Sequence, residues 1–340
     1  MIRKVALAAL VVGLVAGAGL LAAEPAPADP SAPEVVITRD QARELFGGKA
    51  AKMILFHRYR EEKKDIRSLF LLDFSREKIE PEFVVSHHTA RISPDGTRIA
   101  FVTRKGDVRD IINVCRLEKD GGKDKKELDY GGQPTWWVDP KSGEEHIVFP
   151  SGCGPGMTLI RPIKKGTCEE GGPLRILSEE RAFDGGRSPD GKYLCGGMWW
   201  ADQRVAELED PLALRDARFK ILWEGGGRNL SFCANPKRPV TVLCPNYNES
   251  LSLMSGPKER EGLPLPEPFN RVEMALCSRH PDYVGAVLWA CPKGAKQPTE
   301  RGAFVYQLST KKWVQITRSP WTDMGEFWKS ATCDLWVGDK

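Results

Sequence analysis

The chain has 340 residues, 50 of them basic and 46 acidic, and a formal net charge of +4. Domains that bind nucleic acid usually carry a basic stripe and a high pI, so this balance argues against a nucleic-acid partner. Hydrophobic residues make up 41% of the sequence, which is enough for the core of an ordinary globular protein.

The N-terminus has the features of a secretory signal. Two basic residues precede the apolar run 5–21, and two small residues, Ala22 and Ala23, follow it. These are the three parts of a cleaved signal peptide. A retained anchor is the alternative, because the run approaches the ~20 residues that span a bilayer. We expect residues 1–23 to be removed, which leaves no stable membrane span and a periplasmic or secreted protein.

A Pro/Ala-rich linker, residues 24–37, separates the signal from the body of the chain, residues 38–340. The body opens with Thr38-Arg-Asp-Gln41, which has the form of a capping box. Two glycines, Gly47 and Gly48, follow and favour a helix end. The pattern predicts a short helix of about two turns. Beyond it, short apolar segments bounded by Gly, Pro, Asp and Asn predict strands to the end of the chain.

These strands repeat. A strand, a Ser-Pro-Asp-Gly turn and a second strand occupy residues 90–102, and the pattern returns at residues 186–195. Weaker copies lie at residues 137–149, 232–243 and 276–288. The turn prolines are spaced near the ~40–50 residues of one propeller blade: Pro94, Pro140, Pro189, Pro236 and Pro281.

The run Ser93-Pro-Asp-Gly-Thr-Arg-Ile-Ala-Phe-Val102 resembles the repeat of TolB-like propellers, also called the WD40-like or PD40 repeat. The resemblance covers about residues 50–340 and implies an all-β propeller, a fold that commonly serves as an interaction platform.

The blade count follows from the inner strands. They are predicted to begin near His88, Pro134, Asp184, Asn229, Arg271 and Gly325. The last of these is followed by only one more strand before the chain ends, whereas the strands near Met53 and Leu69 have no inner strand of their own. Joining the two ends completes one blade and closes the ring. We predict six four-stranded blades closed by N- and C-terminal strands; seven blades are the alternative, because residues 297–321 are longer than one blade needs.

Polar residues near the start of each inner strand are the candidate site, because the six entries converge on one mouth of the channel. They are His87, His88, Gln133, Thr135, Asp184, Asn229, Ser231, Glu273 and Glu326. Imidazole and carboxylate together can hold a divalent cation, with His88 and Asp184 as the leading candidates. The same set can bind a polar ligand, and a water-filled channel without a ligand is the alternative.

Adjacent tryptophans form a second candidate surface, at Trp136 and Trp137 and again at Trp199 and Trp200. Neighbours along a strand face opposite sides of the sheet, so one ring of each pair is available to stack on a sugar or a partner protein. The alternative is that both rings fill the gaps between neighbouring blades.

Nine cysteines fit an oxidising destination. Cys153 and Cys168 flank a hairpin and are the best candidates for one disulfide, although several pairings are compatible with the sequence. Cys233 and Cys277 have the pattern of small buried hydrophobes.

The sequence carries no Gly-x-Ser-x-Gly, His-Glu-x-x-His or P-loop motif. We therefore expect a non-catalytic binding module for a protein or cell-envelope glycan partner. The alternative is a metal-assisted polysaccharide lyase or hydrolase at the channel mouth. Oligogalacturonate lyases are similar propellers that use several separated channel histidines, whereas here only the pair His87 and His88 lies at a strand entry.

Overall fold

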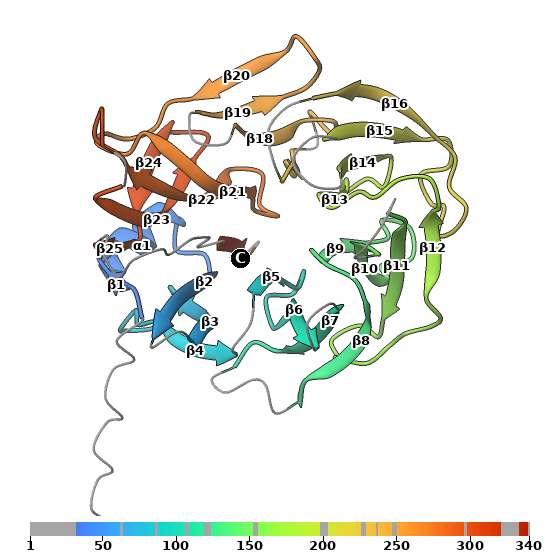
Figure 1. Cartoon of the computed structure of the whole chain (residues 1–340), viewed down its shortest axis with the longest axis horizontal. Helices are drawn as coiled ribbons and strands as arrows, with labels where there is room; N and C mark the ends of the chain where they lie inside the picture. The colour runs from blue at the N-terminus through green and yellow to red at the C-terminus, as the bar shows by residue number, and fades with distance from the viewer. Residues whose placement is uncertain are drawn as a thin grey trace, which may run out of the picture. The chain divides into compact units, whose positions relative to one another are not determined.

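The computed structural model describes residues 32–61, 64–85, 88–105, 109–118, 124–151, 156–197, 203–225, 229–235, 237–246, 250–295, 298–320 and 333–338. The predicted signal segment, residues 1–23, lies outside these ranges. In the body of the chain, six antiparallel sheets follow one another around a central axis, so the protein is a six-bladed β-propeller (Figure 1). The all-β fold and the count of six blades are both confirmed.

Each blade is named here by its place along the chain, and its strands are given from the axis outwards. The first blade contains β5 (His88–Ile92), β6 (Arg98–Lys105), β7 (Arg109–Arg116) and β8 (Lys126–Tyr130). The second contains β9 (Thr135–Val138), β10 (Glu145–Pro150), β11 (Thr158–Ile163) and β12 (Arg175–Ser178). The third contains β13 (Gly186–Arg187), β14 (Tyr193–Gly196), β15 (Arg204–Leu208) and β16 (Phe219–Glu224).

The fourth blade contains β17 (Ser231–Phe232), β18 (Val242–Asn246), β19 (Ser250–Met254) and β20 (Arg260–Leu263). The fifth contains β21 (Arg271–Cys277), β22 (Tyr283–Ala290) and β23 (Glu300–Gln307), with its fourth strand in two parts, β24 (Lys312–Gln315) and β25 (Thr317–Pro320). The short β1 (Glu34–Val35) pairs with β25 and adds an outer edge to this sheet.

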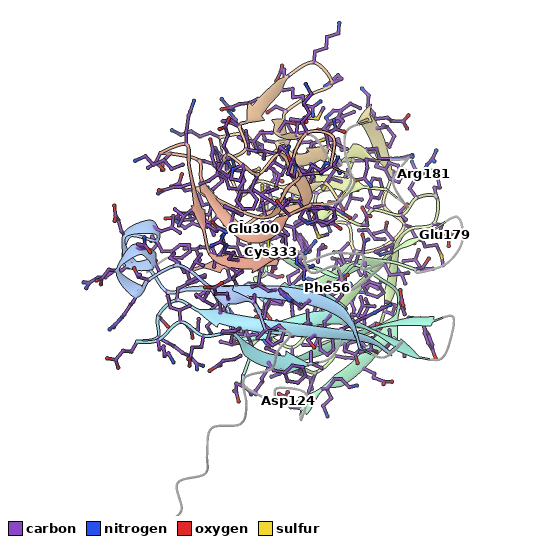
Figure 2. All side chains as sticks on the ribbon, turned by 60° about the vertical axis from the view of Figure 1, so that its left-hand side comes forward. Phe56, Asp124, Glu179, Arg181, Glu300 and Cys333 are labelled. Carbon is purple, nitrogen blue, oxygen red and sulfur yellow. The ribbon has the colours of Figure 1, made fainter. Side chains whose placement is uncertain are left out.

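The closing blade joins the two ends of the chain. Its innermost strand is β26 (Cys333–Val337), and the remaining three are β2 (Ala51–Glu61), β3 (Lys64–Asp73) and β4 (Glu82–Val85). Ala51 pairs with Val337, and Leu55 pairs with Cys333. Figure 2 labels Cys333 and Phe56 at this junction.

The closure is as predicted, but its details are not. The inner strand of the closing blade starts at Cys333 instead of near Gly325, and the described C-terminal residues contribute one strand where we expected two. Three strands of this sheet, β2, β3 and β4, come from the N-terminal part of the chain, and β26 is the fourth among the described residues. Residues 321–332 lie outside the described ranges.

The predicted helix is present as α1 (Arg39–Leu45). The Thr38 hydroxyl accepts a hydrogen bond from the Gln41 amide at 3.2 Å, and the Gln41 side chain accepts one from the Thr38 amide at 2.9 Å. This is the reciprocal capping box. The helix packs on the fifth blade, where the Tyr283 hydroxyl donates to the Leu45 carbonyl at 2.9 Å.

The Ser-Pro-Asp-Gly turns show why the motif recurs. In the first blade, Asp95 accepts hydrogen bonds from the Ser93 hydroxyl and the Thr97 amide, and Gly96 donates its amide to the Ser93 carbonyl. Gly96 has φ +70, and a Cβ there would lie 2.6 Å from the Trp336 ring. Only glycine fits this combination of backbone angle and close packing. Ser188, Asp190 and Gly191 repeat the arrangement in the third blade.

The core lies between the blades. Ala100 and Val102 of the first blade share a buried cluster with Trp136 and Phe149 of the second. Trp137 belongs instead to the next cluster, together with Leu194 and Ala206 of the third blade. Each blade therefore buries both of its faces against its neighbours, which is how a ring of twisted sheets becomes one stable unit.

Candidate ligand pocket in the central channel

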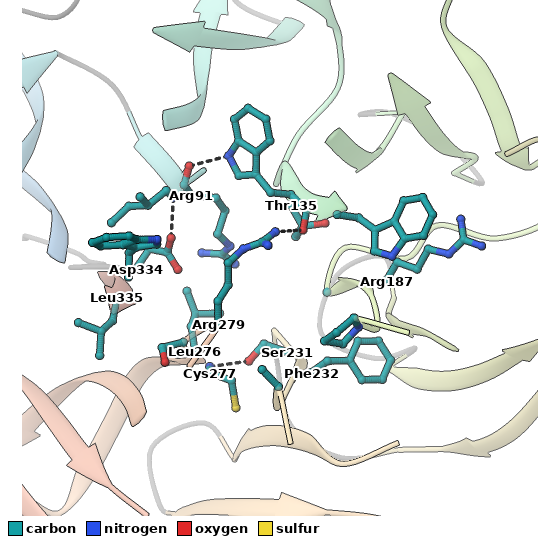
Figure 3. A pocket seen from close by; sticks show the side chains of 18 of the residues that line it. Arg91, Thr135, Arg187, Ser231, Phe232, Leu276, Cys277, Arg279, Asp334 and Leu335 are labelled. Carbon is teal, nitrogen blue, oxygen red and sulfur yellow. Dashed lines mark hydrogen bonds between the residues drawn. The ribbon is translucent and has the colours of Figure 1, made fainter. Parts of the chain in front are cut away.

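A pocket of about 210 Å³ opens on the propeller axis. At ~30 Å³ per water, this space holds on the order of seven waters, or one small chemical group. All six inner strands or the turns after them contribute to its lining (Figure 3). One side chain from each blade, from the first to the closing blade, is Arg91, Trp136, Arg187, Phe232, Leu276 and Leu335.

Two arginines and one aspartate form the polar centre of this pocket. Figure 3 shows the side chains of Arg91 and Arg279 in the middle of the pocket, with Asp334 on one side and Thr135 on the other, and Arg279 extends towards Thr135. Asp334 Oδ2 accepts a hydrogen bond from the Ile92 amide at 2.6 Å. Burial raises the pKa of Asp334, and the positive charges of Arg91 and Arg279 oppose this rise. The carboxylate is therefore partly satisfied within the protein.

Arg279 spans the channel from the fifth blade to the second. Its Nη2 donates a hydrogen bond to the Trp136 carbonyl at 2.7 Å. Arg279 is exposed to the space of the pocket, yet the protein atoms gathered around it remove enough water to lower the pKa of Arg279 to about 10. Arg279 is still a cation at neutral pH.

Arg91 is half-buried, and its Nη1 atom is enclosed without a hydrogen-bond acceptor among the described residues. An enclosed guanidinium nitrogen without an acceptor is costly, because the group has lost water and gained nothing in exchange.

Arg187 has a different role. Its guanidinium donates to the carbonyls of Gly191, Ala213 and Pro211 and lies 4.1 Å from the centre of the Trp137 ring. Burial lowers its pKa to about 10. Each of its three nitrogens donates to a carbonyl of the third blade, and Asp139, Asp190 and Asp210 lie within electrostatic reach, so Arg187 is largely engaged within the protein.

The pocket hydroxyls are also engaged. Thr135 Oγ1 donates to the Val148 carbonyl at 3.1 Å, and Ser278 Oγ donates to the His280 carbonyl at 2.8 Å. Ser231 Oγ accepts a hydrogen bond from the Cys277 amide at 3.0 Å. Most of the remaining wall is apolar or aromatic.

Of the predicted entry residues, the structure brings Thr135 and Ser231 into the pocket wall. The pocket lies mainly along the later residues of the inner strands, toward the turns, and not at the strand entries. His87 and Glu326 lie outside the described residues, and for His88 only the backbone is described. Their roles in ligand or cation binding stay predictions.

Asp184 lies behind the pocket wall and ties together parts of the third blade. Its Oδ1 accepts a hydrogen bond from the Gly197 amide at 3.0 Å, and the Gln203 side chain donates a further one. Asp184 is 8% exposed, and burial raises its pKa to about 6. This carboxyl group thus has a structural use, and Gly185 next to it lines the pocket.

Three other entry residues lie where the backbone is irregular. Gln133 and Asn229 have φ +45 and φ +53, in the left-handed region that non-glycine residues seldom adopt. Glu273 sits at a register shift of β21 and interacts electrostatically with Arg301. The entries are therefore places where the chain turns sharply into the inner strand.

The tryptophan pair of the second blade does not form an open surface. Trp136 and Trp137 are 7% and 2% exposed and fill the gaps on the two sides of their blade. For this pair, the structure therefore matches the alternative that both rings fill the gaps between neighbouring blades. The edge of Trp136 reaches the pocket, and its Nε1 donates to the Arg91 carbonyl at 3.0 Å. Trp199 and Trp200 lie outside the described residues.

Cys233 and Cys277 lie on neighbouring blades, and their Sγ atoms are 2.6 Å apart. Cys233 is buried, as predicted, whereas Cys277 is half-buried and lines the pocket. Cys168 is buried with its Sγ 3.8 Å from Asp124 Oδ2; Cys153 lies outside the described residues, so their disulfide stays a prediction. Within the described ranges, no three His, Cys, Asp or Glu side chains gather closely enough to hold a metal.

The pocket arginines were missed at the sequence level, although a signal for them exists. Each stands two or three residues before a turn proline: Arg91 before Pro94, Arg187 before Pro189, and Arg279 before Pro281. The arginines do not occupy strictly equivalent positions of the repeat, but all three stand near the end of an inner strand, and these ends meet at the axis.

Comparison with known proteins supports the fold. No family model and no curated protein sequence matches the chain. Among solved structures, TolB from Acinetobacter baumannii aligns over 87% of this chain and 69% of its own, with a TM-score of 0.52 and 11% identity. At this identity the likeness shows the fold alone: this chain has a propeller similar to that of TolB.

Two further structures align less closely. The periplasmic gluconolactonase PpgL of Pseudomonas aeruginosa aligns over 79% of this chain and 96% of its own, with a TM-score of 0.46 and 13% identity. A prolyl endopeptidase aligns over 84% of this chain and 53% of its own, with a TM-score of 0.44 and 15% identity. The chain thus spans about half the length of that peptidase.

Among the described residues, no helix has both the length and the apolar character needed to cross a membrane.

Proposed function

We propose that this chain is an exported β-propeller that acts as a binding module, in the periplasm or outside the cell, for a protein or a cell-envelope glycan. The observation that carries the proposal is the pocket on the axis, to which all six blades contribute. It combines an apolar and aromatic wall with a few charged groups, which is the usual make-up of a ligand site. Export is inferred from the N-terminal sequence.

The pocket is the best place for a partner to be recognised. Elsewhere, each blade buries both faces against its neighbours, and the second-blade tryptophans are part of that packing. On the axis, by contrast, side chains of six repeats face a common space that remains open. A protruding group of a larger partner can enter this space while the rest of the partner rests on the rim.

The experiment is a thermal-shift screen of the full chain against uronic-acid and neutral oligosaccharides, peptides and divalent cations. A ligand at a hundred times its Kd adds about 2.7 kcal/mol to the stability, which gives a measurable rise in Tm. A cation-dependent rise that is lost in His88→Ala would instead favour the metal-assisted lyase or hydrolase.

A pocket-filling variant shows whether a ligand uses this site. Ala234 is half-buried and lines the pocket, so Ala234→Trp fills it without removing a charge or a hydrogen bond from any side chain. Ala295→Trp, at an exposed position outside the pocket, is the matched control. We expect Ala234→Trp to abolish the shift and Ala295→Trp to preserve it. An undiminished shift in Ala234→Trp would move the binding site elsewhere on the propeller.

A further inference from the structure

The charged side chains that line the pocket are three arginines and one aspartate: Arg91, Arg187, Arg279 and Asp334. Asp334 is the only carboxylate among the lining residues, and it already accepts the Ile92 amide. Asp184 is within electrostatic reach of Arg91, but its hydrogen bonds go to Gly197 and Gln203. The lining of the pocket thus carries more positive than negative charge.

Two of these arginines have donors to spare. A guanidinium group carries five N–H donors. Arg279 gives one hydrogen bond to a described residue, the carbonyl of Trp136. Arg91 gives none from its side chain, although its Nη1 is enclosed. Burial of a guanidinium group without a matching acceptor lowers stability, so this arrangement is typical of a site whose acceptor arrives with a ligand.

The missing acceptor is an oxyanion. The planar fork of arginine matches the two oxygens of a carboxylate, and such charge-assisted pairs are the strongest hydrogen bonds in proteins. Two guanidinium groups in one small pocket can bind the same carboxylate together, either through both of its oxygens or through one oxygen each. A space of about 210 Å³ has room for that group and one small substituent.

The rest of the wall indicates what the carboxylate is attached to. Trp136, Phe232, Leu276 and Leu335 present apolar surface. The hydroxyls of Thr135 and Ser278 donate to protein carbonyls, and the Ser231 oxygen accepts a hydrogen bond from the Cys277 amide, so each of the three already uses part of its hydrogen-bonding capacity within the protein. A sugar acid would bring several hydroxyl groups that find few partners here, and each unpaired buried hydroxyl is costly. An apolar group that carries one carboxylate fits better.

We propose that the pocket binds the C-terminal carboxylate of a peptide whose last residue is apolar, with Arg91 and Arg279 as the carboxylate-binding residues. This inference rests on the proposed binding function and narrows its partner to a protein. Arg187 lines the pocket but is engaged by carbonyls of the third blade, and Asp334 positions the two guanidinium groups.

The test uses isothermal titration calorimetry on the full chain. The probes are an acetylated dipeptide ending in leucine, as the free acid and as its C-terminal amide, together with glucuronate and inorganic phosphate. Loss of one charged hydrogen-bonding partner corresponds to about tenfold or more in affinity. We expect the free acid to bind at least tenfold more tightly than the amide, glucuronate and phosphate.

Variants identify the residues. Arg279→Gln and Arg91→Gln should each weaken binding of the free acid by about tenfold or more. Arg318→Gln, which removes an exposed arginine of the fifth blade, should leave binding unchanged. Equal affinity for acid and amide, or binding that survives both pocket substitutions, would overturn the proposal.

Different outcomes would exclude the carboxylate site and the proposed binding function. If glucuronate binds and the peptide acid does not, the peptide assignment is wrong, whereas the pocket stands as a binding site. If only uncharged ligands bind and Ala234→Trp abolishes that binding, the carboxylate assignment is wrong and the binding function stands. If no ligand of either screen depends on Ala234, both the inference and the proposed site are wrong.

Discussion

Arg98 and Arg91 belong to the same blade and stand only seven positions apart, yet their surroundings are opposite. Arg98 is fully buried and donates to Asp95, to Glu145 and to the Thr167 carbonyl, each at 2.8 Å. Its positive charge is matched by two carboxylates. This cluster joins the first blade to the second. Its two carboxylates balance the guanidinium charge, although Arg98 Nε, like Arg91 Nη1, has no hydrogen-bond partner among the described residues.

Arg91 and Arg279 have one carboxylate beside them in the pocket wall, Asp334, which is also bonded to a backbone amide. The other carboxylates within electrostatic reach bind protein groups: Asp95 and Glu145, near Arg279, bind Arg98, and Asp184, near Arg91, accepts the Gly197 amide. Their donors face an open pocket instead of a neighbouring blade. The comparison teaches that burial of arginine does not by itself indicate function. What separates a structural cluster from a candidate binding site is whether the protein supplies the acceptors.

The largest expected loss of stability comes from breaking the cluster around Arg98. Arg98→Met leaves Glu145 buried without its partner, and breaking such a pair costs about 3–5 kcal/mol. Urea denaturation should show this loss. The double variant Arg98→Met with Glu145→Gln should lose less than the two single losses added together, because the residues are coupled. A loss below about 1 kcal/mol in the single variant would mean that this cluster does not hold the two blades together.

The next effect concerns Asp184, a buried carboxyl group that lacks an arginine partner in hydrogen-bonding contact. Its pKa rises from an ordinary 3.8 to about 6. An acid whose pKa is raised on folding holds its proton more tightly in the folded state. Stability should therefore fall by about 3 kcal/mol as pH rises from about 4 to above 6.

Asp184→Asn should remove this part of the pH dependence and leave the remainder of the curve unchanged. The comparison is of unfolding free energies of the wild type and the variant, measured between pH 4 and pH 7. Identical curves for the two proteins would show that Asp184 does not titrate in this range. Asp184→Ala should destabilise the third blade, because the Gly197 amide loses its acceptor.

A smaller effect is expected where tryptophan joins neighbouring blades. Trp336 Nε1 donates to the Pro94 carbonyl at 2.9 Å and so ties the closing blade to the first turn. Trp336→Phe keeps most of the ring and loses this hydrogen bond, for about 1 kcal/mol. Trp136→Phe, which loses the bond to the Arg91 carbonyl, is the matched variant for the first and second blades. If the midpoint of unfolding is unchanged in both variants, these two hydrogen bonds do not stabilise the contacts between the blades.

The smallest change in stability is expected at the pocket. Arg91→Gln relieves the enclosed Nη1, which has no acceptor among the described residues, but it also takes a positive charge away from buried Asp334. Because these two effects oppose each other, the free energy of unfolding should change by only about 0.5 kcal/mol. The same urea experiment that tests Arg98→Met gives this value directly. If Arg91→Gln lowers the free energy of unfolding as much as Arg98→Met does, Arg91 is structural. The two arginine clusters would then not differ in their role.

The sequence by itself determined the architecture. Ser93, Asp95 and Gly96 close a turn through contacts within four residues, so their pattern reports the local structure wherever it recurs. The spacing of such turns indicated the blade length, and the predicted inner strands, with the two chain ends joined in one blade, indicated the count of six. Thr38 and Gln41 likewise specify a helix start through bonds to each other. Local hydrogen bonds of this kind depend little on the rest of the chain.

Only the tertiary structure decided where the pocket lies and which residues line it. Arg279 meets the carbonyl of Trp136, 143 positions away, and Asp334 meets Ile92 across 242 positions. Asp184 has the residue type and position of a ligand-binding group, yet its carboxyl binds Gly197 within its own blade. A residue type shows what chemistry is possible, whereas the acceptors and donors around it in the folded ring decide whether that chemistry is left for a partner.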